Sequence, residues 1–316
     1  MQIRGRPLHF GVQLQAQRTT WADYSSAVKA VEELGFGSVW TFDHLLPFAG
    51  PDDRDCFETL TTLAAMALLT ARARFGVLVN GNLYRHPAVL AKAAAQVDQM
   101  SAGRLEFSLG AAWAKREFDA YGLDFPSLSE RYARLAEALE VVKLLWSQPR
   151  TTFSGRFYRL SAAPCEPKPA QSPRPPITIG GTGRGSLKLA ARHADRLNMI
   201  GPPERCSECV KRLSQFCEEA GRDVDEIEFS LHPSFSVGAT REKAEAIAAA
   251  TAERLGIDLL AQEGRWLIGT PAEVTRALRP YLEVGISHFV FASGFPFDPE
   301  PLRLLREEVL PALGST

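Results

Sequence analysis

The sequence predicts an α/β fold, a (β/α)8 TIM barrel with insertions, and two observations lead to that prediction. Short apolar segments alternate with longer amphipathic segments along the chain, which is typical of parallel strands joined by helices. Eight such units fit into 316 residues if the barrel carries insertions. A doubly wound sheet is the runner-up, but the stretch GVQLQAQRTT at the first strand lacks the glycine-rich turn expected there.

The predicted strands are short apolar runs, in chain order residues 8–13, 38–42, 73–80, 104–109, 177–180, 196–200, 228–235 and 288–292. Apolar residues recurring every three or four positions predict the main helices, at residues 20–34, 59–70, 87–100, 127–146, 186–193, 203–220, 271–284 and 299–310. The first helix has the clearest boundaries. Thr20 and Asp23 match a capping box, and Gly35 is placed to end the helix.

Two segments fall outside this alternation. Residues 151–176 are rich in proline and have no period, which predicts a surface excursion rather than a linker between domains. An alanine-rich helix at about residues 240–256 is expected to be an addition to the barrel. We therefore expect one domain over residues 1–316 that carries these two additions.

Composition and charge narrow the classes of function. The net charge of −1 and the pI near 6.6 argue against a nucleic-acid partner, which requires a basic excess. The N-terminal stretch MQIRGRPLHF has no apolar core of a signal peptide, and no apolar run is long enough for a membrane span. These features predict a soluble, cytoplasmic protein.

The five cysteines are scattered, which predicts free thiols in a reducing compartment. Cys206 and Cys209 have the spacing of half a zinc site, but no second pair accompanies them. Both lie on a predicted helix, so we expect buried helix residues and no metal site.

Small, amide and titratable residues follow the predicted strand ends, where barrels of this kind carry their chemistry. In chain order these are Gln13, Asp43 with His44, residues 80–82, residues 110–113, residues 180–184, Asn198, His232 or Ser234, and Ser293 with Gly294. Asp43 and His44 are the only adjacent carboxylate and imidazole in the chain.

The stretch ITIGGTGRGS runs from a strand through a glycine-rich turn directly into a helix. Free N–H groups and the helix dipole then converge on one point, which favours a phosphate, and Arg184 is placed to pair with it. The stretch is not a dinucleotide fingerprint, because Ser186 stands where a glycine is required, and it has no Gly-Lys-Ser/Thr. A turn that serves only tight packing is the alternative.

Several motifs together resemble those of the luciferase-like superfamily, in particular its deazaflavin-dependent (coenzyme F420) oxidoreductases. The motifs are TFDHLLP, YRHPAVLAKAAAQVDQMSAGRLEFSLGAAW, FSGRFYRL with EPKP, ITIGGTGRGS and IGTPAEV. The resemblance covers nearly the whole chain. It implies that F420, or alternatively FMN, lies across the C-terminal mouth of the barrel, that a non-prolyl cis peptide occurs within residues 78–80, and that the chain forms a homodimer.

The resemblance also implies roles for individual residues. His44 would give or take the proton that accompanies hydride transfer, and Asp43 would orient it or bind the ring. The residues implied in cofactor binding are Val79, Asn80, Gly81, Asn82, Gly110, Ala111, Ala112, Trp113, Gly180, Gly181, Thr182, Gly183 and Arg184. Gln13, Glu117 and Asn198 would contact the substrate. Adjacent strand residues point to opposite faces, so Asp43 and His44 need not meet.

The chain departs from its relatives at two places. Ala112 and Ala114 interrupt the pattern after the fourth strand, and Arg196 with Leu197 is expected to change a wall of the substrate pocket. The leading interpretation is an enzyme that moves hydride between F420 and a small organic substrate. An FMN-dependent monooxygenase and a non-catalytic cofactor-binding protein are the alternatives. A basic stripe formed by Arg184, Lys188 and Arg192 favours the acidic tail of F420, unless it is only a solvated helix face.

Overall fold

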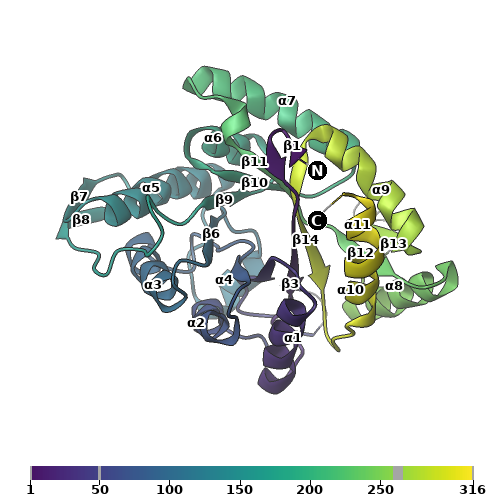
Figure 1. The fold of residues 1–316 in the computed structure, drawn as a ribbon. Coiled ribbons are helices and arrows are strands. Elements are labelled where there is room, and N and C mark those ends of the chain that lie inside the picture. The colour runs from purple at the N-terminus through teal and green to yellow at the C-terminus, as the bar shows by residue number, and fades with distance from the viewer. Residues whose placement is uncertain (1, 49–50, 259–265, 315–316) are drawn as a thin grey trace.

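A ring of parallel strands with helices around it forms the centre of the molecule (Figure 1). The computed structural model describes residues 2–48, 51–258 and 266–314. Its barrel strands, in spatial order, are β3 (His9–Leu14), β4 (Ser38–Thr41), β5 (Arg74–Val77), β6 (Leu105–Leu109), β9 (Ile177–Gly180), β10 (Arg196–Met199), β11 (Glu228–Leu231) and β14 (Ile286–Ser293). Because β14 pairs with both β11 and β3, the ring closes, and the predicted (β/α)8 barrel is confirmed.

The helices that cover the barrel are α1 (Trp21–Glu33), α2 (Thr59–Leu69), α3 (Pro87–Met100), α4 (Lys115–Tyr121), α5 (Leu128–Ser147), α6 (Arg184–His193), α7 (Pro203–Ala220), α8 (Arg241–Leu255), α9 (Pro271–Val284) and α10 (Glu300–Leu304). Short helical turns η1 (Val224–Glu226), η3 (Leu305–Val309) and α11 (Leu310–Ala312) complete the set. In the described part of the chain, no helix combines the length and apolarity that crossing a bilayer requires.

Local sequence explains where several helices begin and end. The Thr20 hydroxyl accepts a hydrogen bond from the Asp23 N–H at 3.1 Å and caps α1. The Asp23 carboxylate accepts from the Thr20 hydroxyl at 2.8 Å, so the predicted capping box is only half formed. Gly35 follows α1 with φ of +81°, a conformation that favours glycine. The complete capping box lies at α9, where Thr270 and Glu273 each bind the other's backbone N–H.

The seventh predicted strand, residues 228–235, is not continuous. Pro233 cannot donate a ladder hydrogen bond, and β11 ends at Leu231 before β12 (Ser234–Val237) begins. The second piece leaves the barrel ring and pairs with β13 (Trp266–Gly269), a strand that the sequence analysis did not predict. β12 joins the last residues of β14 through a single register pair, Ser234 with Ala292.

Two small hairpins were also not predicted. The pair β1 (Gln2–Ile3) and β2 (Arg6–Pro7) brings Arg4 over the ring of Phe229, 4.3 Å from its centroid, at the N-terminal end of the barrel. The proline-rich segment 151–176 contains β7 (Thr151–Ser154) and β8 (Arg159–Ala163), which project beyond α5 (Figure 1).

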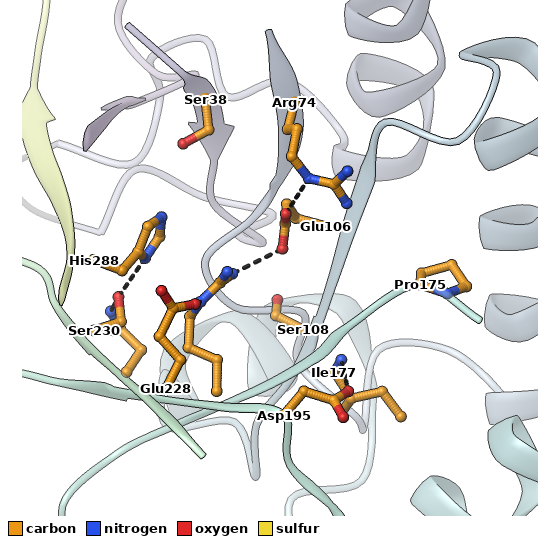
Figure 2. Close-up of polar contacts among 12 residues, drawn as sticks. Ser38, Arg74, Glu106, Ser108, Pro175, Ile177, Asp195, Glu228, Ser230 and His288 are labelled. Atoms are coloured by element: carbon orange, nitrogen blue, oxygen red, sulfur yellow. Dashed lines mark hydrogen bonds and ion pairs between the residues drawn. The ribbon is translucent and has the colours of Figure 1, made fainter. Parts of the chain in front are cut away.

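A chain of paired charges lies at the N-terminal end of the barrel interior, and its three inner members, Glu106, Arg196 and Glu228, are buried (Figure 2). Glu106 bonds Arg74 on one side and Arg196 on the other, with 2.7 Å to the Arg196 guanidinium. Arg196 also donates to Glu228 at 2.6 Å. The predicted role of Arg196 in a wall of the substrate pocket is therefore wrong. It lies two residues before Asn198 on the same face of β10, one layer deeper in the barrel.

Candidate active site

The strand ends surround a cavity of about 440 Å³ at the C-terminal mouth of the barrel. The predicted residues that line it are Asp43, His44, Val79, Asn80, Gly81, Gly110, Ala111, Ala112, Trp113, Gly180, Gly181 and Asn198. The cavity also has lining residues that were not assigned to the site, namely Leu78, Tyr84, Leu128, Arg131, Tyr132, Ser186, Ile200 and His232. Distant segments of the chain thus meet around one space.

His44 is held by Glu117, a carboxylate from α4. The His44 Nδ1 and the Glu117 Oε1 are 2.5 Å apart. Glu117 is 1% exposed and also accepts hydrogen bonds from the Leu45 N–H at 2.8 Å and the Tyr84 hydroxyl at 2.7 Å. Burial raises the pKa of Glu117, but the hydrogen bonds from His44, Tyr84 and Leu45 outweigh it and leave that pKa below its ordinary value. An ionised Glu117 fixes the proton on Nδ1 and leaves Nε2 for chemistry.

Asp43 points away from His44. Its carboxylate accepts two hydrogen bonds from Arg85, at 2.8 and 3.0 Å, and one from the Gly81 N–H at 2.8 Å. Arg85 in turn binds Glu58 at 2.5 Å. Asp43 therefore anchors the loop after β5, and the group that orients the imidazole is Glu117.

Val79 forms the floor of the cavity. The Leu78–Val79 peptide is cis, where the resemblance to the F420 enzymes places such a bond. The Leu78 carbonyl accepts a 3.0 Å hydrogen bond from Gln13, which is buried and lies outside the cavity lining. A Cβ at Gly110 or Gly180 would come within 2.8 or 3.0 Å of the Val79 methyl groups. Glycine at these two strand ends is thus what lets the Val79 side chain occupy the mouth.

A strand, a glycine turn and a helix follow one another here, as the sequence predicts. Gly181 has φ of +115°, and α6 begins after Gly183 with no side chain capping its first N–H groups. Ser186, in the first turn, lies 3.1 Å from the Tyr132 hydroxyl at the cavity wall. The uncapped N–H groups beside this wall are suited to a phosphate.

The predicted cation, Arg184, does not line the cavity. Arg184 is exposed, lies outside the cavity lining and stands over Phe216 of α7, 5.8 Å from the ring centroid. Lys188 shares the same ring at 5.3 Å. Arg131 of α5 lines the cavity instead, and its guanidinium donates to the Ala112 carbonyl at 2.6 Å.

Several residues that line the cavity carry a buried polar atom without a hydrogen-bond partner among the described residues. These atoms are Asn80 Oδ1, His232 Nε2 and Arg131 Nε. Burial lowers the pKa of His232 to about 4, so its ring is neutral near pH 7. Unpaired buried polar groups cost free energy, so their cluster at one cavity fits a ligand with polar edges, such as a flavin or deazaflavin ring.

The other predicted residues lie beside the cavity rather than in its lining. Asn82 donates to the Tyr158 hydroxyl at 3.3 Å, and Thr182 accepts from Arg205 at 3.1 Å. Gly183 is the first residue before α6 and, like Thr182, is not a lining residue. Cys206 and Cys209 are buried in α7, and the described residues contain no cluster of three or more potential metal ligands.

Comparisons with known proteins place these features in context. The profile of the family described as luciferase-like monooxygenase matches residues 7–288. The F420-dependent glucose-6-phosphate dehydrogenase of Nakamurella multipartita is 30% identical and covers 97% of each chain. A solved F420-dependent secondary alcohol dehydrogenase, in complex with an F420-acetone adduct, has a TM-score of 0.83 at 23% identity, over 97% of this chain and 99% of that chain. The monooxygenase RslO1 from Streptomyces bottropensis has a TM-score of 0.81 at 25% identity, over 96% and 99%.

Proposed function

This chain belongs to the luciferase-like monooxygenase family, and from that premise we propose that it is an F420-dependent oxidoreductase acting on an alcohol or a ketone. The named activities of its relatives support F420 rather than another cofactor. The cluster of unpartnered polar atoms at the cavity supports a bound polar ring. When bound, the deazaflavin supplies the carbon that gives or accepts hydride.

The observation that carries the proposal is the pair formed by His44 and Glu117. Because Nδ1 donates to a buried carboxylate, Nε2 is the ring nitrogen left for a substrate in the cavity that His44 lines. Nε2 takes the hydroxyl proton when an alcohol is oxidised and returns it when a ketone is reduced. Glu117 favours the imidazolium that forms, and Tyr84 and Leu45 hold Glu117 in place. Glu117 is thus a positioning residue, and Asp43 supports the loop that borders the ring.

We propose a place for each part of the cofactor from the residues that line the cavity. The ring would lie against Val79, with Asn80, Asn198 and His232 at its edges. The phosphate would lie at the start of α6, beside Gly181, Ser186 and Tyr132, with Arg131 as a cation of the lining. The exposed Arg184 and Lys188 are left for the acidic tail outside the cavity.

We also propose a cytoplasmic homodimer built from single-domain subunits. Trp21, Leu68 and Val89 are large apolar side chains left 42%, 73% and 61% exposed on the neighbouring helices α1, α2 and α3. Such a surface favours a partner of its own kind. Sedimentation of the purified chain should give twice the monomer mass, and a monomer at micromolar concentration would contradict this part.

Titration of the protein with F420 and with FMN, followed by quenching of cofactor fluorescence, tests the choice of cofactor. F420 should bind at least tenfold more tightly, as roughly 1.4 kcal/mol of preference implies. An FMN-dependent monooxygenase is the second candidate, because the solved monooxygenase shares the fold across nearly the whole chain. Tight FMN binding with no measurable F420 binding would favour that activity and exclude ours.

A further inference from the structure

A second cavity, of about 620 Å³, lies between α8, β12, β13 and the end of β14. Its lining is largely apolar, with Phe48, Phe235, Ile247, Leu255 and Trp266 among the side chains that face it. None of the residues that we assign to the cofactor belongs to this lining except Trp113. The cavity is therefore space that the proposed cofactor does not use.

Trp113 connects the two cavities, because it lines both of them. Its ring lies 5.5 Å from the His44 ring, and the Phe48 ring lies 6.1 Å from His44 on the side of the second cavity. Trp113 is 66% exposed, so packing does not fix it as a closed wall. His44 thus stands where a molecule in the second cavity would meet the cofactor cavity.

The polar groups of the second cavity include two that only donate hydrogen bonds. Arg254 is half-buried, and among the described residues its guanidinium makes one long hydrogen bond, 3.4 Å to the Thr251 hydroxyl. No ion pair of Arg254 with a carboxylate occurs among residues 2–48, 51–258 and 266–314. The Trp266 Nε1–H is buried, and the described residues offer it no acceptor. The exposed Asp298 also borders the cavity, and its carboxylate accepts from the Glu300 N–H at 3.0 Å.

We propose that this cavity binds the substrate, and that the substrate is a largely apolar alcohol or ketone ending in a carboxylate. Its carboxylate meets Arg254 and the Trp266 N–H, its apolar body lies along Phe235, Ile247 and Leu255, and its reacting carbon passes Trp113 to His44. The inference rests on the proposed oxidoreductase function. It departs from the sugar phosphate named for the dehydrogenase relatives, because apolar walls would leave sugar hydroxyl groups unpaired.

The test uses the full-length protein and three matched pairs of probes. 5-Oxohexanoate, 7-oxooctanoate and 9-oxodecanoate are compared with 2-hexanone, 2-octanone and 2-decanone, and glucose 6-phosphate is the polar comparison. Quenching of tryptophan fluorescence reports binding without requiring turnover, because Trp113 and Trp266 line the cavity. Oxidation of reduced F420 by each ketone then reports catalysis.

The best keto acid should bind roughly 10- to 100-fold more tightly than its matched methyl ketone, as expected for a charge-assisted contact. Arg254→Met should abolish that preference and Arg254→Lys should keep part of it. The substitution preserves the 2.7 Å hydrogen bond from Arg18, which goes to the Arg254 carbonyl, so the fold should survive. Arg279→Met, on the exposed face of α9, is the matched control and should leave the preference intact.

Ile247→Trp provides a second variant, which fills the cavity and should weaken acids and ketones alike. Three results would overturn the inference. The wild type could bind acid and ketone equally, the preference for the acid could survive Arg254→Met, or glucose 6-phosphate could bind more tightly than every keto acid. Arg254-dependent binding without F420 oxidation would support the cavity and overturn the oxidoreductase proposal. F420 turnover of other substrates that neither Arg254→Met nor Ile247→Trp affects would support the oxidoreductase proposal and overturn the assignment of this cavity.

Discussion

The two ends of the barrel interior are both polar, but they differ in whether their polar groups are paired with one another. At the N-terminal end, Arg74, Glu106, Arg196 and Glu228 form one continuous chain of ion pairs, of which Figure 2 labels Arg74, Glu106 and Glu228. At the C-terminal mouth, Asn80, His232 and Arg131 each keep a buried atom without a partner in the described chain. Paired charges satisfy one another within the protein, whereas polar atoms without a partner can be satisfied by a ligand. Residue type alone would not have told the two ends apart.

The largest effect should come from the mouth, at His44. Replacement by alanine removes the proton acceptor and should lower kcat by about 10²- to 10⁴-fold, measured as F420 turnover with a working substrate. The dissociation constant for F420 should change little, because Glu117 and the loops it supports remain.

Glu117→Gln should shift the pH profile of kcat, which a purely structural role would not do. Wild-type turnover by His44→Ala would remove His44 from the mechanism.

At the N-terminal end of the barrel, a substitution should change the free energy of unfolding rather than the activity. Arg196→Met leaves Glu106 and Glu228 as buried carboxylates without their shared cation, which should cost about 3–5 kcal/mol of unfolding free energy. Urea unfolding followed by circular dichroism measures it. Arg241→Met, which breaks the exposed pair of Arg241 with Glu245, is the control and should have a much smaller effect. If the two variants were equally stable, the N-terminal network would not be structural.

The pH dependence of stability tests whether His232, at the mouth, is buried and neutral in the folded protein. Burial lowers the pKa of His232 from 6.5 to about 4, so below pH 6.5 the unfolded chain takes up a proton that the folded chain refuses until about pH 4. Stability therefore falls as the pH drops through this window. His232→Gln should reduce the loss between pH 7 and pH 5 by about 2 kcal/mol.

His193 supplies the matched control for this experiment. Burial, with Lys143 and Arg192 nearby, lowers the pKa of His193 to about 4 as well, but this residue lies on α6 outside the cavity lining. His193→Gln should flatten the acid profile similarly and leave F420 affinity unchanged, whereas His232→Gln should alter both. A flat wild-type profile between pH 7 and pH 5 would contradict the buried, neutral state of both rings.

The smallest effect separates two arginines near the phosphate site. Arg131→Met should weaken F420 binding about tenfold, because Arg131 lines the cavity and supports the Ala112 carbonyl. Arg184→Met should weaken it by less than about threefold, because an exposed cation over Phe216 is screened by water. Fluorescence titration measures both. The reverse order would return the phosphate contact to Arg184, as the sequence analysis expected.

Sequence patterns were sufficient for those parts of the site that depend on strand ends. Parallel strands bring their C-terminal ends to one rim, so the positions of His44, Asn80, Gly110 and Gly180 followed from strand order alone. The Glu117 contact did not follow, because Glu117 is 73 residues from His44 and approaches from a helix. Only tertiary packing brings that helix to the mouth.

Depth within the barrel was the second thing that sequence could not supply. Arg196 and Asn198 are two residues apart and share a face of β10. Arg196 nevertheless belongs to the ion pairs at the N-terminal end of the barrel, and Asn198 lines the cavity. Alternation predicts the face of a strand but not the layer along the barrel axis. The break at Pro233 was visible in the sequence, but the destination of β12 beside β13 depends on a pairing that no local pattern encodes.

Strand β14 has a consequence for how such proteins diversify. Along one edge, its first residues pair with β11 and its last residues carry β12, with β13 attached beyond, while the other edge pairs with β3. The pairing with β11 and the attachment of β12 thus use different stretches of the same edge. Substitutions in β12, β13 and α8 therefore leave the pairs that close the ring in place. With the substrate in the second cavity, as we propose, a lineage could keep its redox chemistry while it exchanges the compound on which that chemistry acts.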